Sequence, residues 1–388
     1  MIHLVLNSPY LGGAERSAIE QASMSFEVSQ LVFHIPKITT SIEDTDVYKF
    51  LQKKIPQCHI SEFPFQKQLF QVSRTHFLSQ IFGLLFIPIA VMKIYFYRKR
   101  MNLSKADVLW LNGNKAAVLF LMSLLCGEMQ AKLVWHWRDY PSTSGMISLV
   151  KVLLKILKPK RLLLLANSLS VEKSLKAWRP ISSIATDYVY NPSGEINLKE
   201  FLKVETLGIA SMLAPWKGHH DVLLNISTNK KELQDLGIKR CLIFGEEIYQ
   251  TSGEHAGYKK QLEKLIRKLN IQDFVFLKGN AMPVDIYSQI DLLVHSSVKA
   301  EPFGRVLIES FLAGIPVLST GLGGAGEVIG EHFERGWVYQ IHHPQDFFKQ
   351  ISNIILAKNT PEKLGLAKKW SYSINGQIPG KLKEVFQN

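Results

Sequence analysis

Short apolar segments alternate with helix-like segments along most of the chain, and this alternation limits the fold more than any other feature. The first half holds five strand candidates, IHLVLN, SQLVFHIP, ADVLWLN, KLVWHW and RLLLLAN. The pattern starts again near Leu207 with LGIASM, RCLIFG, FVFLKG, DLLVHS and PVLST. Strands that alternate with helices form a parallel sheet with helices on both faces. The sequence therefore predicts an α/β protein with two doubly wound, Rossmann-like domains.

The chain has 388 residues, which fits two or three domains at roughly 150 residues each. We predict an N-terminal domain over 1–195, a C-terminal domain over 204–370, and a helix over 371–388 that packs back on the N-terminal domain. Two such domains make a cleft, and ligands bind beyond the carboxyl ends of parallel strands. Functional residues are therefore expected in the strand-to-helix loops.

The charge balance indicates anionic partners. Lys and Arg total 46 against 33 Asp and Glu, a formal net charge of +13, which favours phosphorylated ligands, lipid head groups or nucleic acid. The cations are not interleaved with a nucleic-acid motif, so we expect no nucleic acid as partner.

The three cysteines form no metal-binding spacing, and we expect neither a metal nor a cofactor. Asp44 to Asp46 read DTD in a polar stretch, which we assign to the surface.

Two segments combine apolar residues with cations, over 77–100 and 148–161. Residues 77–92 carry no charge but fall short of the roughly 20 residues that span a bilayer. KIYFYRKR follows them, and Lys151, Lys155 and Lys158 recur at helical spacing in the second segment. One interpretation is contact with an anionic membrane surface. The other is two core-packing helices with solvated lysines. The start MIHLVLNS lacks a basic leader, so we expect a cytoplasmic protein, peripheral on the inner face of the plasma membrane under the first interpretation.

Two loops of the first half carry polar or glycine residues that their strands do not require. Gly12 and Gly13 follow the first strand, where a backbone without side chains and a helix N-terminus favour an anion. A bare turn explains the two glycines nearly as well. His136 and Arg138 come at the end of KLVWHW. They suit acid/base chemistry or contact with sugar hydroxyl groups, and the alternative for His136 is a packing residue.

Three loops of the second half add cations, carboxylates and glycines. Lys217 and Gly218 precede a helix and suit a diphosphate, although a solvated lysine is the commoner case. Glu301 and Glu309 lie eight residues apart around a predicted helix start, so they are placed to hold two ends of one nucleotide sugar. The alternative for Glu309 is a buried carboxylate capped by backbone or a lysine. GLGGAG matches GxGxxG but follows the last predicted strand, so a phosphate or base contact is preferred to a dinucleotide site.

These segments together carry a resemblance to a known family. EPFGRVLIES resembles the E-x7-E signature of the retaining family 4 glycosyltransferases of GT-B fold, the glycosyl transferases group 1. GGAERS, VWHWRDY, LLANS, YNPSG, APWKGHHDVL and GGAGEVI are similar to that family's other segments in the same order. The resemblance implies a UDP- or GDP-linked sugar donor bound mainly by the C-terminal domain. It also implies a saccharide or lipid-linked acceptor at the N-terminal domain, and hexosyl transfer with retained configuration and without a metal.

The resemblance also implies roles for individual residues. His136, Glu301 and Lys217 would be catalytic, with His136 and Glu301 at the donor sugar and Lys217 at the diphosphate. Glu309 would hold the ribose hydroxyl groups. The implied donor-binding set is Gly12, Gly13, Arg138, Asn191, Lys217, Gly218, Glu301, Phe303, Gly304, Arg305, Glu309, Gly323 and Gly324. One departure is Met212, where the family usually has an arginine, and our hypothesis is that Arg305 or Arg138 supplies the missing charge.

The function that these features favour is a glycosyltransferase for a cell-envelope polysaccharide, lipopolysaccharide or other glycolipid. A nucleotide-sugar 2-epimerase of the same fold is the nearest alternative, because it would use the same two-domain cleft. An NAD(P)-dependent oxidoreductase that uses GLGGAG is a second alternative.

Overall fold

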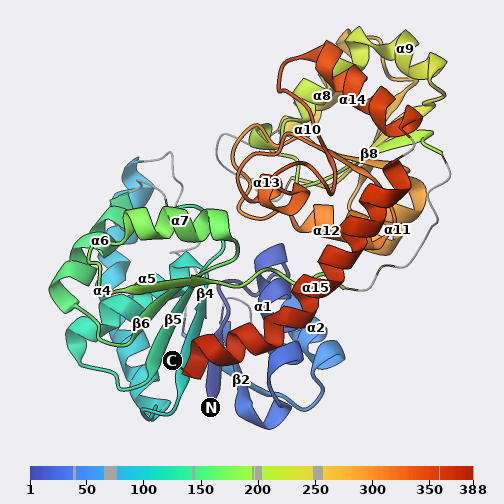
Figure 1. Cartoon of the computed structure of the whole chain (residues 1–388). Coiled ribbons are helices and arrows are strands. Elements are labelled where there is room, and N and C mark those ends of the chain that lie inside the picture. Colours follow the sequence, from blue (N-terminus) through green and yellow to red (C-terminus); the bar gives the residue numbers. More distant parts are fainter. Residues whose placement is uncertain are drawn as a thin grey trace. The chain divides into compact units, whose positions relative to one another are not determined.

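The computed structural model divides into two compact units (Figure 1). The first unit comprises Met1–Pro192 and Gly376–Asn388, and the second comprises Ser193–Asn375. The structure describes residues 1–37, 41–64, 77–141, 145–194, 196, 203–247, 257–357 and 359–387.

The first unit is built on a seven-stranded parallel sheet with the order β3-β2-β1-β4-β5-β6-β7. Its strands are β1 (Ile2–Val5), β2 (Leu31–Pro36), β3 (His59–Phe63), β4 (Val108–Asn112), β5 (Lys132–Trp137), β6 (Leu162–Ala166) and β7 (Ala185–Tyr188). Every residue of β4, β5 and β6 is buried, as expected for central strands covered on both faces. The strand order reverses between β1 and β4.

Helices cover both faces of this sheet (Figure 1). Side chains of α4, α5, α6 and α7 pack on one face together with Leu109 and Trp135. Side chains of α1, α2 and the end of α15 pack on the other face together with Leu4 and Trp110. The bounds are α1 (Gly13–Ser25), α2 (Asp46–Lys54), α4 (Phe77–Arg100), α5 (Asn114–Met122), α6 (Gly145–Leu157), α7 (Leu169–Trp178) and α15 (Thr360–Gln387), with short 3-10 turns η1 (Val28–Gln30) and η2 (Ser123–Cys126).

The second unit repeats this plan with a six-stranded parallel sheet in the order β10-β9-β8-β11-β12-β13. Its strands are β8 (Thr206–Ala210), β9 (Arg240–Phe244), β10 (Val275–Gly279), β11 (Leu292–His295), β12 (Val317–Ser319) and β13 (Trp337–Val338). Its helices are η3 (Pro215–Lys217), α8 (His219–Thr228), α9 (Lys230–Asp235), α10 (Tyr258–Lys268), α11 (Pro283–Gln289), α12 (Arg305–Leu312), α13 (Gly324–Ile329) and α14 (Pro344–Leu356). The strand order reverses between β8 and β11. The prediction of two doubly wound α/β domains is confirmed.

Four elements were not expected from the sequence. The strands β3, β7 and β13 lie at sheet edges, where one side of the strand has no partner and polar side chains are tolerated. The helix α2 begins directly after Thr45, whose hydroxyl accepts a hydrogen bond from the Tyr48 amide. Asp44 and Asp46 are exposed, as the sequence predicted, and the buried Thr45 between them caps the helix. Because β13 follows β12, the GLGGAG loop does not follow the last strand of its sheet.

The C-terminal helix also differs from the expected segment 371–388. It is the single helix α15, which begins at Thr360. Its last part belongs to the first unit, where Leu382, Val385 and Phe386 join the core. The Lys132 ammonium donates a hydrogen bond of 2.6 Å to the Val385 carbonyl oxygen.

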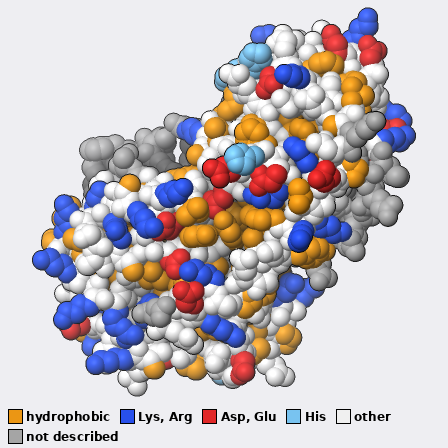
Figure 2. All heavy atoms as spheres, in the orientation of Figure 1, with side chains coloured by type: hydrophobic (Ala, Val, Ile, Leu, Met, Phe, Trp, Pro, Cys, Tyr) orange, Lys and Arg blue, Asp and Glu red, His pale blue; other side chains and the backbone are white. Residues whose placement is uncertain are grey.

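The two segments with apolar and cationic residues form the helices α4 and α6. In the part of the chain that the structure describes, no helix is long and apolar enough to cross a membrane. In α4, Val91 and Ile94 are buried in the core and Arg98 is buried as well, donating to two backbone carbonyl groups. In α6, Val152 and Ile156 are exposed. Figure 2 shows cationic side chains dispersed over the visible face of the first unit, with acidic side chains among them.

Candidate functional site

The predicted site residues of each unit lie near the point where its strand order reverses. In the second unit this point is between β8 and β11, whose following loops carry Lys217 and Glu301. In the first unit it is between β1 and β4. Gly12 and Gly13 form the start of α1 after β1, whereas His136 lies in β5, which pairs with the far side of β4. Ligands of open parallel sheets bind outside the carboxyl ends of strands at such reversals. The topology therefore places Lys217, Glu301 and the Gly12–Gly13 turn where a ligand is expected, and His136 one strand away.

Lys217 and Glu301 form a largely buried ion pair in the second unit. The Lys217 ammonium lies 2.6 Å from Glu301 Oε2, and the two side chains are 12% and 13% exposed. The same ammonium lies 4.1 Å from the centre of the Trp216 ring, a cation–π contact. The Ser297 hydroxyl donates to Glu301 Oε2 at 2.9 Å. Residues that are 84 positions apart in the sequence thus meet in one cluster.

Hydrogen bonding keeps the Glu301 carboxylate ionised. Burial alone would raise its pKa, but the hydrogen bond from His295 and the charge of Lys217 hold the pKa well below its usual range. His295 Nε2 lies 3.5 Å from Glu301 Oε2, and its Nδ1 lies 3.0 Å from the Ser319 hydroxyl. Because an ionised carboxylate only accepts, any hydrogen bond from His295 to Glu301 is donated by Nε2–H. The cluster is therefore a preorganised carboxylate and ammonium pair.

Glu309 lies within α12 and has two partners. Arg305 Nε donates to Glu309 Oε1 at 2.9 Å, one helical turn away. The buried Tyr287 hydroxyl, from α11, lies 3.2 Å from Glu309 Oε2 and 2.9 Å from the Val306 carbonyl oxygen. Burial, followed by the charge of Glu309, raises the pKa of Tyr287 well above its usual value. An arginine and a tyrosine thus bind the Glu309 carboxylate. The alternative that we drew from the sequence, a carboxylate capped by backbone or a lysine, named other partners.

Two glycines of this region are required by close backbone approach. Gly218 has a φ of +72°, and a Cβ there would lie 1.9 Å from the Ser296 carbonyl oxygen. A Cβ on Gly324 would lie 2.3 Å from the Pro302 carbonyl oxygen. The loops after β8, β11 and β12 are therefore packed side by side, with Gly323 bridged to Glu301 as in a parallel sheet. Phe303 is buried at the base of these loops, and Gly304 is the N-cap of α12.

In the first unit His136 is completely buried in β5. Trp110 Nε1, which can only donate, lies 3.1 Å from His136 Nδ1. The proton of the neutral imidazole is therefore on Nε2, and this atom has no hydrogen-bonding partner among the described residues. Burial, assisted by the charge of Arg138, holds the pKa of His136 well below its ordinary value. His136 Nε2–H is thus a neutral donor that is buried without a hydrogen-bonding partner among the described residues.

Arg138 connects four segments of the first unit. Its guanidinium donates to the side-chain oxygens of Asn112, Asn191 and Gln21 at 2.8, 2.5 and 2.9 Å. Gln21 in turn donates to the Tyr190 carbonyl oxygen. Arg138 and Asn191, both predicted to bind the donor, are therefore brought together by a direct hydrogen bond. The hypothesis that Arg138 or Arg305 replaces the charge missing at Met212 remains a prediction, and both guanidinium groups already have protein acceptors.

Sequence reasoning missed four groups of these clusters, namely Glu15, Tyr287, His295 and Ser297. Glu15 lies in the first turn of α1 and is buried, which raises the pKa of its carboxyl to about 7 although Arg138 and two backbone groups favour the ionised form. A carboxylate directly after GGA was a usable signal. His295 and Ser297 follow a predicted strand and could also have been identified, whereas nothing in the sequence near Tyr287 marked it.

The described residues contain no group of three or more His, Cys, Asp or Glu side chains placed to hold a metal ion.

Comparisons with known proteins bear on the family and the fold of the chain. Residues 197–370 match the family model of the glycosyl transferases group 1. Spore coat protein SA of Bacillus subtilis (strain 168) is 26% identical over 155 residues, which are 39% of this chain and 40% of that protein. The match thus spans less than half of that relative's length.

Two crystal structures share the fold over nearly the whole chain. Anabaena HepE in complex with UDP and glucose has a TM-score of 0.71 and 22% identity, covering 98% of this chain and 99% of its own. A glycosyltransferase from Rickettsia africae ESF-5 has a TM-score of 0.73 and 17% identity, covering 100% and 97%. Residues 197–370 therefore match the glycosyl transferases group 1 model, and the chain as a whole has the GT-B fold of these structures.

Proposed function

We propose that the protein transfers a sugar from a UDP- or GDP-linked donor to a saccharide or lipid-linked acceptor, with retained anomeric configuration. The observation that carries this proposal is the Lys217–Glu301 pair at the strand-order reversal of the second unit. It offers one ammonium for a diphosphate and one ionised carboxylate for sugar hydroxyl groups. HepE, whose structures contain UDP or UDP-glucose, supports a uridine nucleotide as the first donor to test.

Lys217 would stabilise the leaving group. When the bond between the anomeric carbon and the diphosphate breaks, the electron pair stays on the phosphate oxygen, and a nearby fixed cation lowers the energy of that charge. The Lys217 position in the loop directly before α8 adds the positive end of a helix to this environment. In the proposed mechanism the protein supplies this charge without a metal.

The two glutamates would hold the two ends of the donor. Glu301 is kept ionised by His295 and Lys217, so it can accept from hydroxyl groups of the sugar. Glu309 uses one oxygen for Arg305 and the other for Tyr287. A carboxylate offers about four lone-pair sites, so two remain for ribose hydroxyl groups. His136 would donate its Nε2–H to a donor hydroxyl group, which would satisfy an otherwise unpaired buried atom.

The retained configuration and the biological role rest on sequence similarity. EPFGRVLIES resembles the signature of retaining enzymes. A spore coat protein and HepE are among the similar proteins, which supports a role in polysaccharide or glycolipid synthesis of the cell envelope. We further propose that the protein works in the cytoplasm beside the inner membrane, where the exposed Val152 and Ile156 of α6 and the cations of α4 would contact anionic lipid.

The donor assignment is tested by binding of UDP and GDP, followed by turnover of their glucose and mannose conjugates. We expect one nucleotide to raise the melting temperature, since a ligand stabilises the folded state by mass action. The Lys217→Ala variant should lose this shift, whereas Lys230→Ala, a cation paired with Asp273 in the same unit, should keep it. Absence of a shift with both nucleotides would overturn the donor assignment.

Product analysis separates transfer from the alternatives. Proton NMR of the donor sugar during the reaction reports the anomeric configuration of the product. Isomerised donor in the absence of any acceptor would instead identify a 2-epimerase. A melting-temperature shift with NADH or NADPH but not with UDP or GDP would identify an oxidoreductase.

A further inference from the structure

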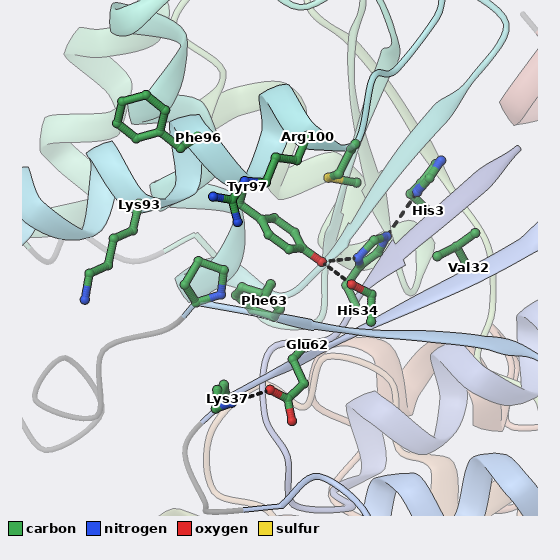
Figure 3. Close-up of a pocket in the computed structure, with 13 residues that line it drawn as sticks. His3, Val32, His34, Lys37, Glu62, Phe63, Lys93, Phe96, Tyr97 and Arg100 are labelled. Atoms are coloured by element: carbon green, nitrogen blue, oxygen red, sulfur yellow. Dashed lines mark hydrogen bonds and ion pairs between the residues drawn. The ribbon is translucent and has the colours of Figure 1, made fainter.

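The first unit contains a cavity of about 850 Å³ between the strands β1 to β3 and the helix α4 (Figure 3). Its size lies within the range of roughly 300 to 1,000 Å³ that is typical of small-molecule sites. None of the residues predicted to bind the donor lines it. The cavity therefore needs an explanation of its own.

A chain of hydrogen bonds forms one wall of the cavity. The Tyr97 hydroxyl points from α4 toward β2 and lies 2.7 Å from His34 Nδ1 and 2.8 Å from the Ser61 hydroxyl (Figure 3). His34 Nε2 lies 3.0 Å from His3 Nδ1. Burial, with the nearby His3, lowers the pKa of His34 to about 3, so its imidazole is neutral. This wall offers uncharged donors and acceptors, the groups that recognise hydroxyls.

The helix α4, which carries Tyr97, also brings unpaired positive charge to the cavity. Lys93 and Arg100 lie seven residues apart on α4, two helical turns, and both are exposed cavity-lining residues (Figure 3). Neither has a hydrogen bond or an ion pair with another described residue, whereas the third cation, Lys37, lies 2.7 Å from Glu62. Two uncompensated cations beside one cavity favour an anion with several oxygens.

An aromatic ring lies between these two cations in the sequence of α4. Phe96 is 55% exposed although it lines the cavity, and Phe63 lines it from β3. Exposed aromatic rings are suited to packing against the carbon face of a ligand. The cavity therefore combines a hydroxyl-binding wall, an aromatic surface and two free cations.

From this combination we propose that the cavity binds a phosphorylated polyol, with the phosphate at Lys93 and Arg100 and the hydroxyl groups at Ser61 and Tyr97. This site is separate from the proposed donor residues and needs no nucleotide. The same chemistry is offered by a free polyol phosphate and by the head group of a phosphatidylglycerol lipid. The inference goes beyond sugar transfer and does not depend on it.

The test is isothermal titration calorimetry of the full chain without nucleotide. The probes are glycerol 1-phosphate, dihexanoyl phosphatidylglycerol below its micelle concentration, inorganic phosphate and glycerol. We expect saturable binding of at least one of the two polyol phosphates, at least tenfold tighter than inorganic phosphate. The tighter of the two identifies the source as a free metabolite or a lipid. Equal binding of inorganic phosphate, or no binding of either polyol phosphate, would overturn the proposal.

Variants assign the binding to this cavity. Lys93→Ala and Arg100→Ala should each weaken binding about tenfold, because each removes one charge-assisted contact. Lys99→Ala is the matched control, since Lys99 lies on the same helix with its ammonium over the Tyr95 ring and does not line the cavity. Ser61→Ala should weaken the polyol phosphates but not inorganic phosphate. Equal losses in Lys99→Ala and Arg100→Ala would show nonspecific charge attraction and refute the site.

Discussion

Each unit holds a buried carboxyl group near a cation at its strand-order reversal, yet the two groups respond in opposite ways. In the first unit the pKa of Glu15 rises to about 7 beside Arg138, because burial outweighs the attraction. In the second unit the pKa of Glu301 falls well below its usual range, because His295 and Lys217 hydrogen-bond to it directly. At Glu15, two backbone hydrogen bonds and the charge of Arg138 do not outweigh burial, whereas at Glu301 the side-chain hydrogen bonds from His295 and Lys217 and the charge of Lys217 do outweigh it.

The partners of the two cations explain this difference. Arg138 directs its hydrogen bonds to three neutral side-chain amides, which fix its position. Lys217 is held by a carboxylate, and a ligand phosphate can replace a carboxylate at an ammonium with the same charge-assisted geometry. The first arrangement suits a structural connection and the second suits exchange with a ligand.

Replacing Arg138 should have the largest effect on stability. Arg138→Ala removes three hydrogen bonds to a charged group and leaves partly buried amide oxygens unpaired, so we expect a loss of about 4 kcal/mol in the free energy of unfolding. Urea unfolding followed by the fluorescence of Trp110, Trp135 and Trp137 in the first unit measures it. Arg161→Ala, at an exposed arginine that donates to two backbone carbonyl groups, is the control. Similar losses in both variants would contradict the special role of Arg138.

Glu15→Gln should stabilise the protein at high pH. The unfolded carboxyl loses its proton near pH 4.5 and the folded one near pH 7, so the folded state binds more protons between these values and stability declines as pH rises. The amide of the variant does not titrate, so the stability of the variant does not decline in this way. We expect the free energy of unfolding of Glu15→Gln to exceed that of the wild type by about 3 kcal/mol at pH 8 and to equal it at pH 4. Urea unfolding at both pH values is the measurement. A gain that is the same at pH 4 and pH 8 would refute the raised pKa.

The Glu301→Gln variant tests a pH dependence of stability that is opposite in sign to that of Glu15. The depressed pKa of Glu301 contributes stability that is complete above pH 4.5 and is lost as the pH falls through the folded value. The variant should therefore flatten the stability profile below pH 4.5 and leave the slope between pH 4.5 and 7 unchanged. The same urea series, extended downward, distinguishes the two carboxyl groups.

Lys217→Ala should weaken nucleotide binding about 30-fold, or about 2 kcal/mol, because one charge-assisted contact to the diphosphate is lost. Titration calorimetry with UDP or GDP measures the dissociation constant. The Glu301→Gln variant keeps Lys217 and is expected to bind nucleotide as the wild type does while transfer is impaired. If both variants bind nucleotide equally well, Lys217 does not contact the diphosphate.

Ser297→Ala should have the smallest effect, a loss of about 1 kcal/mol in unfolding free energy, because one of several hydrogen bonds to Glu301 is removed. Lys217 and His295 still hold the carboxylate. Thermal unfolding with Ser288→Ala, a helix-surface serine of the same unit, as control checks this value. A loss above about 3 kcal/mol would mean that Ser297 rather than Lys217 keeps Glu301 ionised.

The sequence predicted the central strands and the edge strand β10 but missed the edge strands β3, β7 and β13 for a physical reason. Strands such as β6, LLLLA, are buried on both faces and are continuous apolar runs. The edge strands β3 and β7, HISEF and ATDY, are only partly buried and have polar compositions. An apolar pattern in the sequence therefore indicates that side chains are buried. An edge strand that is held mainly by backbone hydrogen bonds leaves little pattern in the sequence.

The candidate site was predicted by residue type and loop position, but not by partner. Lys217, Glu301 and Glu309 were identified because each lies after a strand or at a helix start. Their partners depend on which loops and helices are neighbours in space. Tyr287 reaches Glu309 from α11 across 22 positions of sequence, and no local pattern marks that contact.

The helix α15 has a consequence for the order in which the protein is made. The core of the first unit includes Leu382, Val385 and Phe386, yet the rest of that unit ends at Pro192. A ribosome adds roughly 5–20 residues per second, so the intervening stretch takes on the order of ten seconds or more. The second unit is thus translated in full while the first still lacks a piece of its core. The segment made first is therefore the one that is completed last.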